Sequence, residues 1–353
     1  MRKYAAGRTA RSAAVFVLML LLFPYIVSVF VNGAGADEKP FHVRVRTEGG
    51  GGNETVAEMA WPEYLAGILA LEMPEGCEPE TAKALAVLIR TRLYRDAGSG
   101  ENGSVKERFL TEEELAKRRG VEEARKIFET YVQAVDATDD TVLMYQDSYA
   151  WTPYFQSGSG KTRDAGEVLG TDAYPYLAVR ECPADAEEAE TQEFSFSCGE
   201  IQELCRDFLV AEESGETAEA GYLAADFEIL TRDSAEYVHE MRIGNTVCTG
   251  DQFRDALSLP SAAFAITADP DDSRSVRITT TGKGHGLGMS IRTAERMAEE
   301  GKTYEEILGH FFEGTELRKD MSENEIFQYG NLAIKGITSH LSGKNTVRGD
   351  DNE

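Results

Sequence analysis

One glutamate stands where an acid/base catalyst would be useful. Glu72 lies at the end of the apolar run 64–73, and Pro74 stops the helix that this run predicts. Apolar neighbours disfavour the charged form of a carboxyl and so keep a proton available. Those neighbours are Ile68, Leu69, Leu71 and Met73. The chain holds 62 acidic residues, most of which belong on a solvated surface, so position alone does not make Glu72 a catalyst.

A second candidate is a histidine between glycines. Residues 282–290 read Gly-Lys-Gly-His-Gly-Leu-Gly-Met-Ser, with glycine at four alternate positions. Glycine adopts backbone dihedrals closed to other residues, so His285 is presented here by the main chain. Two interpretations stay open, a constrained site and a plain tight turn with a histidine at its corner.

A third segment, residues 158–162, reads Gly-Ser-Gly-Lys-Thr and invites comparison with a phosphate-binding loop. The full signature needs a glycine where this chain has Phe155. We therefore expect a turn whose hydroxyl groups line a sugar-binding cleft. The hydroxyls that we expect to bind sugar are those of Ser157 and Ser159.

The elements that must position these groups are helices and short strands. Pro62 and Pro79 each fit the first turn of a helix, and the second of these helices carries an apolar stripe flanked by Arg90 and Arg92. We expect helices also at 121–137, 292–299 and 304–312. The strand-like runs are 42–47, 141–145, 151–155, 226–248 and 261–281. This mixture predicts an α+β fold around a groove.

Composition limits the partners. The chain has 353 residues, a formal net charge of −26 and a pI near 4.6, which argues against binding of nucleic acid or anionic lipid. Residues 181–220 hold thirteen acidic residues and one basic residue. We expect this stretch to be an insertion that folds as a helix with a solvated acidic face.

The N-terminus predicts membrane attachment. Residues 1–12 are a basic tail expected in the cytoplasm, and the uncharged run 13–31 is long enough for one transmembrane helix. The alternative is a cleaved signal peptide, with Ala34-Gly35-Ala36 as the cleavage site. Both interpretations place the folded part outside the cytoplasm. We expect an uncleaved anchor, a linker at 32–56, a catalytic domain at 57–342 and a flexible tail at 343–353.

The five cysteines give no clear metal or redox signal. Their odd number leaves at least one unpaired, and no Cys-x-x-Cys occurs. Small, partly buried thiols are the expected state. We expect no cofactor.

Several of these segments together resemble one family. The chain is similar to the stage II sporulation protein D family, which is related to amidase-enhancer proteins of bacterial cell walls. The resemblance runs from about residue 60 to 317. Its specific parts are 64–74 with 80–91 and 284–290 with 297–308 and 312–315, and its looser parts are 134–138, 157–160 and 175–177.

The resemblance implies a lytic transglycosylase that acts on peptidoglycan. It makes Glu72 the catalytic acid/base and identifies Arg90 and Tyr176 with the family's arginine and tyrosine, which we expect to bind substrate. It also implies work in the engulfment membrane of sporulating cells, beside a peptide-cleaving amidase and a polytopic membrane protein. Two alternatives stay open, a non-enzymatic enhancer that binds the wall and a hydrolase that uses a second carboxylate.

The chain departs from the family at two points. Family members usually have Gln-x-Gly-Ala after the Met-Ser pair, whereas Ile291-Arg292-Thr293-Ala294 follows here. Some members bind zinc through a histidine and two cysteines, and no such set lies between Arg92 and Val142. The sequence therefore predicts altered contacts after Ser290 and no zinc site.

Overall fold

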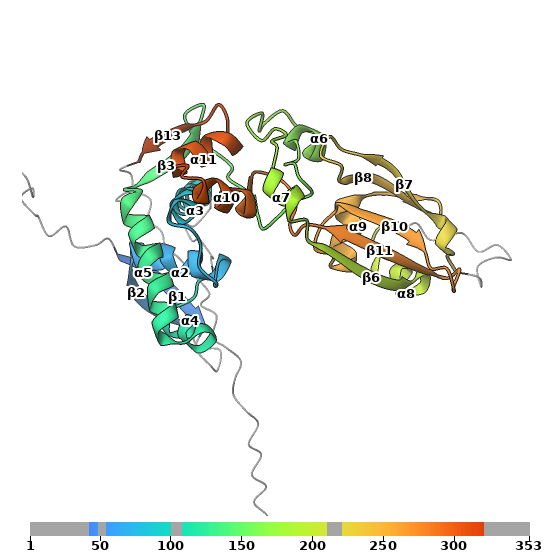
Figure 1. Ribbon diagram of the computed structural model, residues 1–353, viewed down its shortest axis with the longest axis horizontal. Coiled ribbons are helices and arrows are strands. Elements are labelled where there is room, and N and C mark those ends of the chain that lie inside the picture. Colours follow the sequence, from blue (N-terminus) through green and yellow to red (C-terminus); the bar gives the residue numbers. More distant parts are fainter. Residues whose placement is uncertain (1–41, 49–53, 100–107, 210–220, 321–353) are drawn as a thin grey trace, which may run out of the picture. The chain divides into compact units, whose positions relative to one another are not determined.

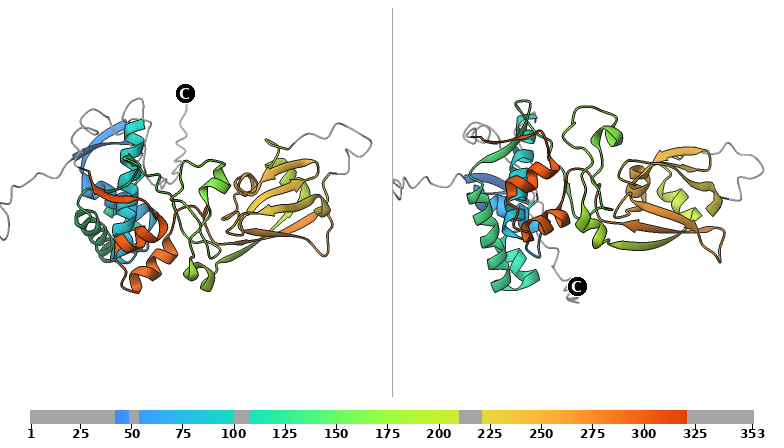
Figure 2. Two further views of the ribbon diagram at one scale, coloured as in Figure 1. Left: turned by 90° about the horizontal axis from the view of Figure 1, so that it is seen from above. Right: turned by 45° about the horizontal axis from the view of Figure 1, so that its top comes forward.

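Helix α3 (Pro79–Ser99) lies at the centre of a group of helices (Figure 1). Residues 84–91 are all buried, so this part of α3 is enclosed by protein on every side. Figure 2 shows two further views of the group. Among the elements that contact α3 are α2 (Trp61–Glu72), α5 (Val121–Ala137), α10 (Ile291–Glu299), α11 (Tyr304–Phe311), β3 (Thr141–Tyr145) and β4 (Ser148–Tyr149).

The structure is a computed structural model that describes residues 42–48, 54–99, 108–209 and 221–320. The described residues from Val43 onward belong to one compact unit. Among the described residues no helix is both long and apolar enough to cross a bilayer. The expected basic tail 1–12, anchor 13–31 and tail 343–353 lie outside them.

The helix ends follow from local chemistry. Pro62 lies in the first turn of α2, and α3 begins at Pro79, as the sequence predicts. Helix α4 (Glu112–Arg119) begins with a capping box, in which the side chains of Thr111 and Glu114 each accept the other's backbone N–H. The remaining short helices are α6 (Ala165–Leu169), α7 (Pro183–Glu187), α8 (Cys198–Leu204), α9 (Gly250–Leu257) and the 3₁₀ turn Ala224–Asp226.

The strands form small sheets, so the α+β expectation is confirmed. Beside the helices, β13 (Glu316–Lys319) and β4 (Ser148–Tyr149) flank β3, and β1 (His42–Glu48) pairs with β2 (Glu54–Ala60). A second pair of sheets has the orders β10-β11-β6 and β7-β8-β9. Their bounds are β6 (Thr191–Ser197), β7 (Phe227–Arg232), β8 (Val238–Ile243), β9 (Thr246–Thr249), β10 (Phe264–Ala268) and β11 (Ser275–Thr281).

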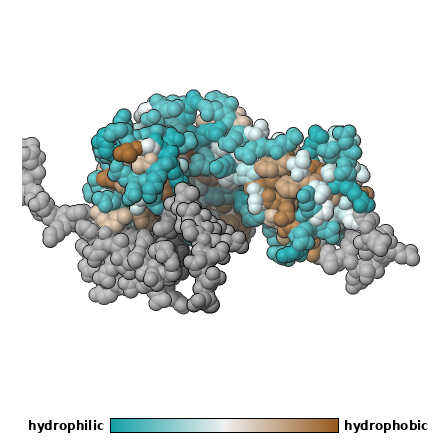
Figure 3. All heavy atoms as spheres, turned by 90° about the horizontal axis from the view of Figure 1, so that it is seen from below, coloured by the Kyte–Doolittle hydropathy of each residue, from teal (hydrophilic) through white to brown (hydrophobic). Residues whose placement is uncertain are grey.

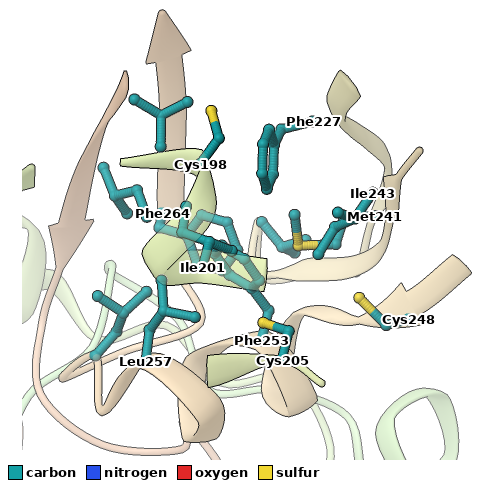
Figure 4. Packing of buried hydrophobic residues seen from close by; sticks show 14 residues of the cluster. Cys198, Ile201, Cys205, Phe227, Met241, Ile243, Cys248, Phe253, Leu257 and Phe264 are labelled. Atoms are coloured by element: carbon teal, nitrogen blue, oxygen red, sulfur yellow. The ribbon is translucent and has the colours of Figure 1, made fainter. Parts of the chain in front are cut away.

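These two three-stranded sheets share a core with α8 and α9 (Figure 4). Phe253 of α9 and Phe264 of β10 lie with ring centroids 5.4 Å apart, and Ile201 of α8 and Met241 of β8 pack in the same cluster. Hydrophilic residues make up much of the described surface visible in Figure 3, as the composition predicts.

One expectation about local structure was wrong. Residues 181–220 were expected to form a helix, but their described part forms α7, β6 and α8. Phe194 and Phe196 alternate with polar residues, and they pair with Ile278 and Val276 of β11, so the period is that of a strand. Strand β2 ends at Ala60, and α2 begins directly after it at Trp61.

The cysteines behave as packing residues. All five lie in the described segments as free thiols, four of them buried. Burial raises the pKa of Cys182 and of Cys205 to about 12, which keeps these thiols protonated and unreactive. This confirms the expectation drawn from their number and spacing.

We predict that Phe253→Ala lowers the free energy of unfolding by about 3–5 kcal/mol, because it leaves a cavity in this core. Urea denaturation of the purified protein measures the change. Val247→Ala on β9 is the matched control, since Val247 is 55% exposed and should change stability by at most about 0.5 kcal/mol. Equal losses in the two variants would show that Phe253 does not carry this core.

Candidate active site

The glycine-rich segment 282–290 is held by backbone hydrogen bonds to other parts of the chain. Its end forms β12 (Met289–Ser290), which runs parallel to β5 (Tyr154–Phe155). Earlier in the segment, Lys283 and Ser157 exchange backbone hydrogen bonds of 2.8 and 3.1 Å, and the Gly284 N–H donates to the Pro260 carbonyl. The segment is thus fixed between two stretches that are far apart in sequence.

Glycine is required in this segment for two separate reasons. Gly284 has φ +130° and Gly288 has φ +78°, a region that L-residues with a side chain rarely adopt. A Cβ on Gly284 would lie 2.4 Å from Phe155 Cβ, and one on Gly288 would lie 2.0 Å from the Pro153 carbonyl oxygen. The glycines therefore allow the main chain around His285 to pack directly against β5.

A buried arginine supports the segment from behind. The Arg163 side chain donates from Nε to Asp233 (2.6 Å) and from Nη1 to Asp251 (2.8 Å). Nη1 also reaches the His285 carbonyl oxygen at 3.2 Å, and the guanidinium lies over the Tyr237 ring. A buried cation is tolerated when it is paired and hydrogen-bonded in this way.

Glu72 lines a cavity of about 440 Å³ together with His285. As the sequence predicts, Glu72 is the last residue of α2, and its carbonyl oxygen accepts from Gln156 Nε2 at 3.3 Å. Its partly buried carboxylate has no hydrogen bond or ion pair to any residue in the described segments. The other lining residues are Tyr154, Phe155, Gln156, Arg254, Asp255, Leu259, Pro260, Lys283, Gly284 and Ile291.

His285 is a neutral imidazole. Its Nδ1 accepts the Leu287 N–H at 3.0 Å, and its ring centroid lies 5.9 Å from that of Phe155. Burial lowers the pKa of His285 to about 4, and the nearby positive charge of Arg254 acts in the same direction. At neutral pH the side chain therefore offers hydrogen bonds without a charge.

A second cavity, of about 330 Å³, adjoins the first. Gln156, Lys283 and Ile291 line both, and we call the two cavities together the groove. Ser157 lines the second cavity, with a buried side chain. The other residues that line the second cavity are mostly charged. They are Glu188, Glu190, Arg292, Glu295, Arg296 and Glu299, with Met73 and Ala184.

Comparison with known proteins relates this chain to sporulation proteins. The family described as "Stage II sporulation protein" matches residues 49–145, a stretch that includes Glu72. The stage II sporulation protein D of Bacillus subtilis (strain 168) is 28% identical over 295 residues, which cover 80% of each chain. That of Bacillus amyloliquefaciens gives the same identity and coverage. The similarity to stage II sporulation protein D thus extends over most of the chain. An uncharacterized protein of Brachyspira hyodysenteriae is also similar, at 27% identity over 74% of this chain and 67% of its own.

Three of the candidate site residues line the groove, namely Glu72, which the resemblance implies as the acid/base, and Ser157 and His285. The nearby Ser159 donates from Oγ to the Ala235 carbonyl oxygen at 3.2 Å and does not line either cavity. Its hydroxyl is thus engaged in holding the turn at 157–160 to the strand-rich part of the fold.

The other two residues expected to bind substrate make structural contacts here. Arg90 is 1% exposed and donates to the carbonyl oxygens of Val135 and Thr141, so it holds the end of α5 to the start of β3. Tyr176 is 3% exposed, and its hydroxyl accepts the Trp151 N–H at 2.7 Å. Neither lines the two cavities, and these contacts give them positioning roles in place of the expected contacts to sugar.

Sequence reasoning missed Gln156 and Asp185. Asp185 is fully buried, and its carboxylate accepts the Gly158 N–H and the Ser290 hydroxyl, each at 2.9 Å. It thereby joins the turn after β5 to the N-terminus of α10, and its burial raises its pKa. No local sequence pattern distinguishes Asp185 from its acidic neighbours. Gln156 directly precedes Ser157, which was already a candidate, so its position in the sequence could have pointed to it.

We predict that His285 stays neutral down to about pH 4, and NMR of ¹⁵N-labelled histidine measures this directly. The unfolded value is about 6.5. A lowered folded pKa stabilises the protein fully above about pH 6.5, and this contribution is lost as the pH falls through about 4. The thermal midpoint should fall over the same range. A midpoint of the ring titration near 6.5 would contradict the burial argument.

Proposed function

We propose that this protein is a lytic transglycosylase that cleaves the bond between N-acetylmuramic acid and N-acetylglucosamine in peptidoglycan. The observation that carries the proposal is the Glu72 carboxylate, which ends α2 in a groove and has no partner among the described residues. The similarity to stage II sporulation protein D agrees with it. A carboxyl that is free of structural duties is available to exchange a proton with a substrate.

The proposed reaction needs one carboxyl. Protonated Glu72 gives its proton to the glycosidic oxygen as the bond from that oxygen to the muramyl C1 breaks. The ionised Glu72 then takes the proton of the muramyl 6-hydroxyl, whose oxygen forms a new bond to C1. The product is a 1,6-anhydro end, and no water is consumed. An ordinary glycosidase places a second carboxylate for a water or a covalent intermediate.

The surroundings suit this chemistry. A neutral His285 can hydrogen-bond to sugar hydroxyls without adding charge. Asp255 is the other carboxylate in the Glu72 cavity, and it is paired with Arg254 at 2.5 Å. Because Asp255 is engaged, a single-carboxyl transglycosylase is favoured over the alternative of a hydrolase.

We further propose that the enzyme works in sporulation, on the outer side of the membrane that holds its N-terminal anchor, during septum and engulfment remodelling. Its substrate is the glycan strand after an amidase has removed the stem peptides. That amidase and a polytopic membrane protein are the proposed partners. The family and the N-terminal sequence support this setting.

One observation favours a second candidate, a wall-binding enhancer of the amidase that cleaves no bond. Ile291 lines both cavities beside Gln156, at a position where the family usually has glutamine. An apolar side chain there removes a hydrogen-bonding group from the middle of the groove. Such a protein would bind glycan strands and raise the turnover of its partner.

We predict that Glu72→Gln lowers the release of anhydro-muropeptides from peptide-stripped glycan by about 10²–10⁴-fold, because it removes the proton donor while keeping the side chain's shape. Mass spectrometry of the products measures the loss. Glu63→Gln, in the exposed first turn of the same helix, is the matched control and should retain activity. Both variants should melt near the wild-type temperature.

The products also separate the candidates. Anhydro ends support transglycosylation, reducing ends support hydrolysis, and binding with no product supports the enhancer. Full activity in Glu72→Gln would remove Glu72 from the reaction.

A further inference from the structure

The groove holds four cationic side chains, and their pairing differs. Arg254 is paired with Asp255 at 2.5 Å, Arg292 with Glu190 at 3.3 Å and Arg296 with Glu188 at 2.5 Å. Lys283 is the exception, since its ammonium has no ion pair or side-chain hydrogen bond to any residue that the structure describes. An anion that entered the groove would pair with Lys283 without breaking a bond already made.

The backbone at Lys283 is also unusually well fixed. Its two neighbours, Gly282 and Gly284, both have positive φ, and its own N–H and C=O bond to Ser157. The side chain is exposed and lines both cavities. The backbone of Lys283 is fixed, whereas its side chain is flexible and ends in a strongly hydrated ammonium. This combination suits the binding of a mobile anion.

A glycan strand carries few charges, and this narrows the choice of anion. Its hydroxyl and acetamido groups are neutral. In a peptide-stripped strand, each muramic acid bears one free carboxylate on its lactyl group, close to the bond that is cleaved. While the stem peptide is attached, that carboxyl is an amide and has no charge.

We propose that Lys283 binds the lactyl carboxylate of muramic acid and so makes the groove selective for stripped strands. The inference rests on the proposed glycan substrate. A protein of net charge −26 repels an anionic strand at long range, so a local cation is needed to accept each carboxylate. A charge-assisted hydrogen bond from Lys283 supplies this.

Binding to two chemically matched strands tests the proposal. One probe is a short, soluble stripped glycan with free lactyl carboxylates, and the other is the same glycan with those carboxyls converted to neutral methylamides. Calorimetry measures both dissociation constants in the Glu72→Gln background, where no strand is consumed. We expect this protein to bind the acid strand roughly fivefold more tightly than the methylamide, since an exposed pair is worth up to about that much.

Variants assign the preference to one residue. Adding Lys283→Gln should bring the ratio of the two constants close to one, and Lys283→Arg should keep most of it. Lys117→Gln on α4 changes the net charge equally, lies outside both cavities, and should leave the ratio unchanged. Raising the salt concentration should shrink the preference.

The contrary outcomes are equally definite. Equal binding of the two strands, a preference that survives Lys283→Gln, or failure to bind the acid strand would overturn the assignment. Failure of the proposed function looks different, because wild-type protein would then release no anhydro ends while the preference for the acid strand, and its dependence on Lys283, remained.

Discussion

The close approach of the backbone at 282–290 to residues 153–157 is the constraint on which the candidate site depends. Backbone hydrogen bonds and the parallel pair β5–β12 make this contact, and a side chain on Gly284 or Gly288 would prevent it. His285 and Lys283 face the groove from the glycine-rich side, and Gln156 links the other side to the end of α2. The position of Glu72 relative to the imidazole thus follows from main-chain packing.

Buried charge keeps this arrangement fixed. Arg163 with Asp233 and Asp251 lies behind the glycine-rich segment, and Asp185 joins the turn at Gly158 to Ser290. Burying such groups costs free energy unless their hydrogen bonds are made, and a misaligned partner would leave a charge unsatisfied. We infer that the main effect of these buried charges is to fix a single geometry, and that their contribution to stability is smaller. Two charged side chains that line the groove, Glu72 and Lys283, have no such bonds to the residues that the structure describes.

The sequence predicted the framework well because its signals are local. Pro62, Pro79 and Pro74 mark the ends of α2 and α3, and Glu72 ends its helix as expected. The acidic stretch was misread because its charge hid the alternation of Phe194 and Phe196, whose partners on β11 lie some eighty positions away. Arg90 shows the same limit. A cation beside an apolar stripe reads alike whether it faces a groove or, as here, buried carbonyl oxygens.

Charge explains why one carboxyl in this groove differs from the rest of an acidic protein. Most carboxylates of the groove are paired with arginine or accept backbone hydrogen bonds, as Asp255, Glu188 and Glu295 do. Each such contact stabilises the ionised form and ties the group in place. A proton donor must cycle between both forms during one turnover. Within the described part of the chain, the Glu72 side chain makes none of these contacts. Glu72 is the last residue of α2, and Gln156 bonds to its backbone carbonyl oxygen and not to its carboxylate. Its freedom to react is therefore a consequence of where the helix stops.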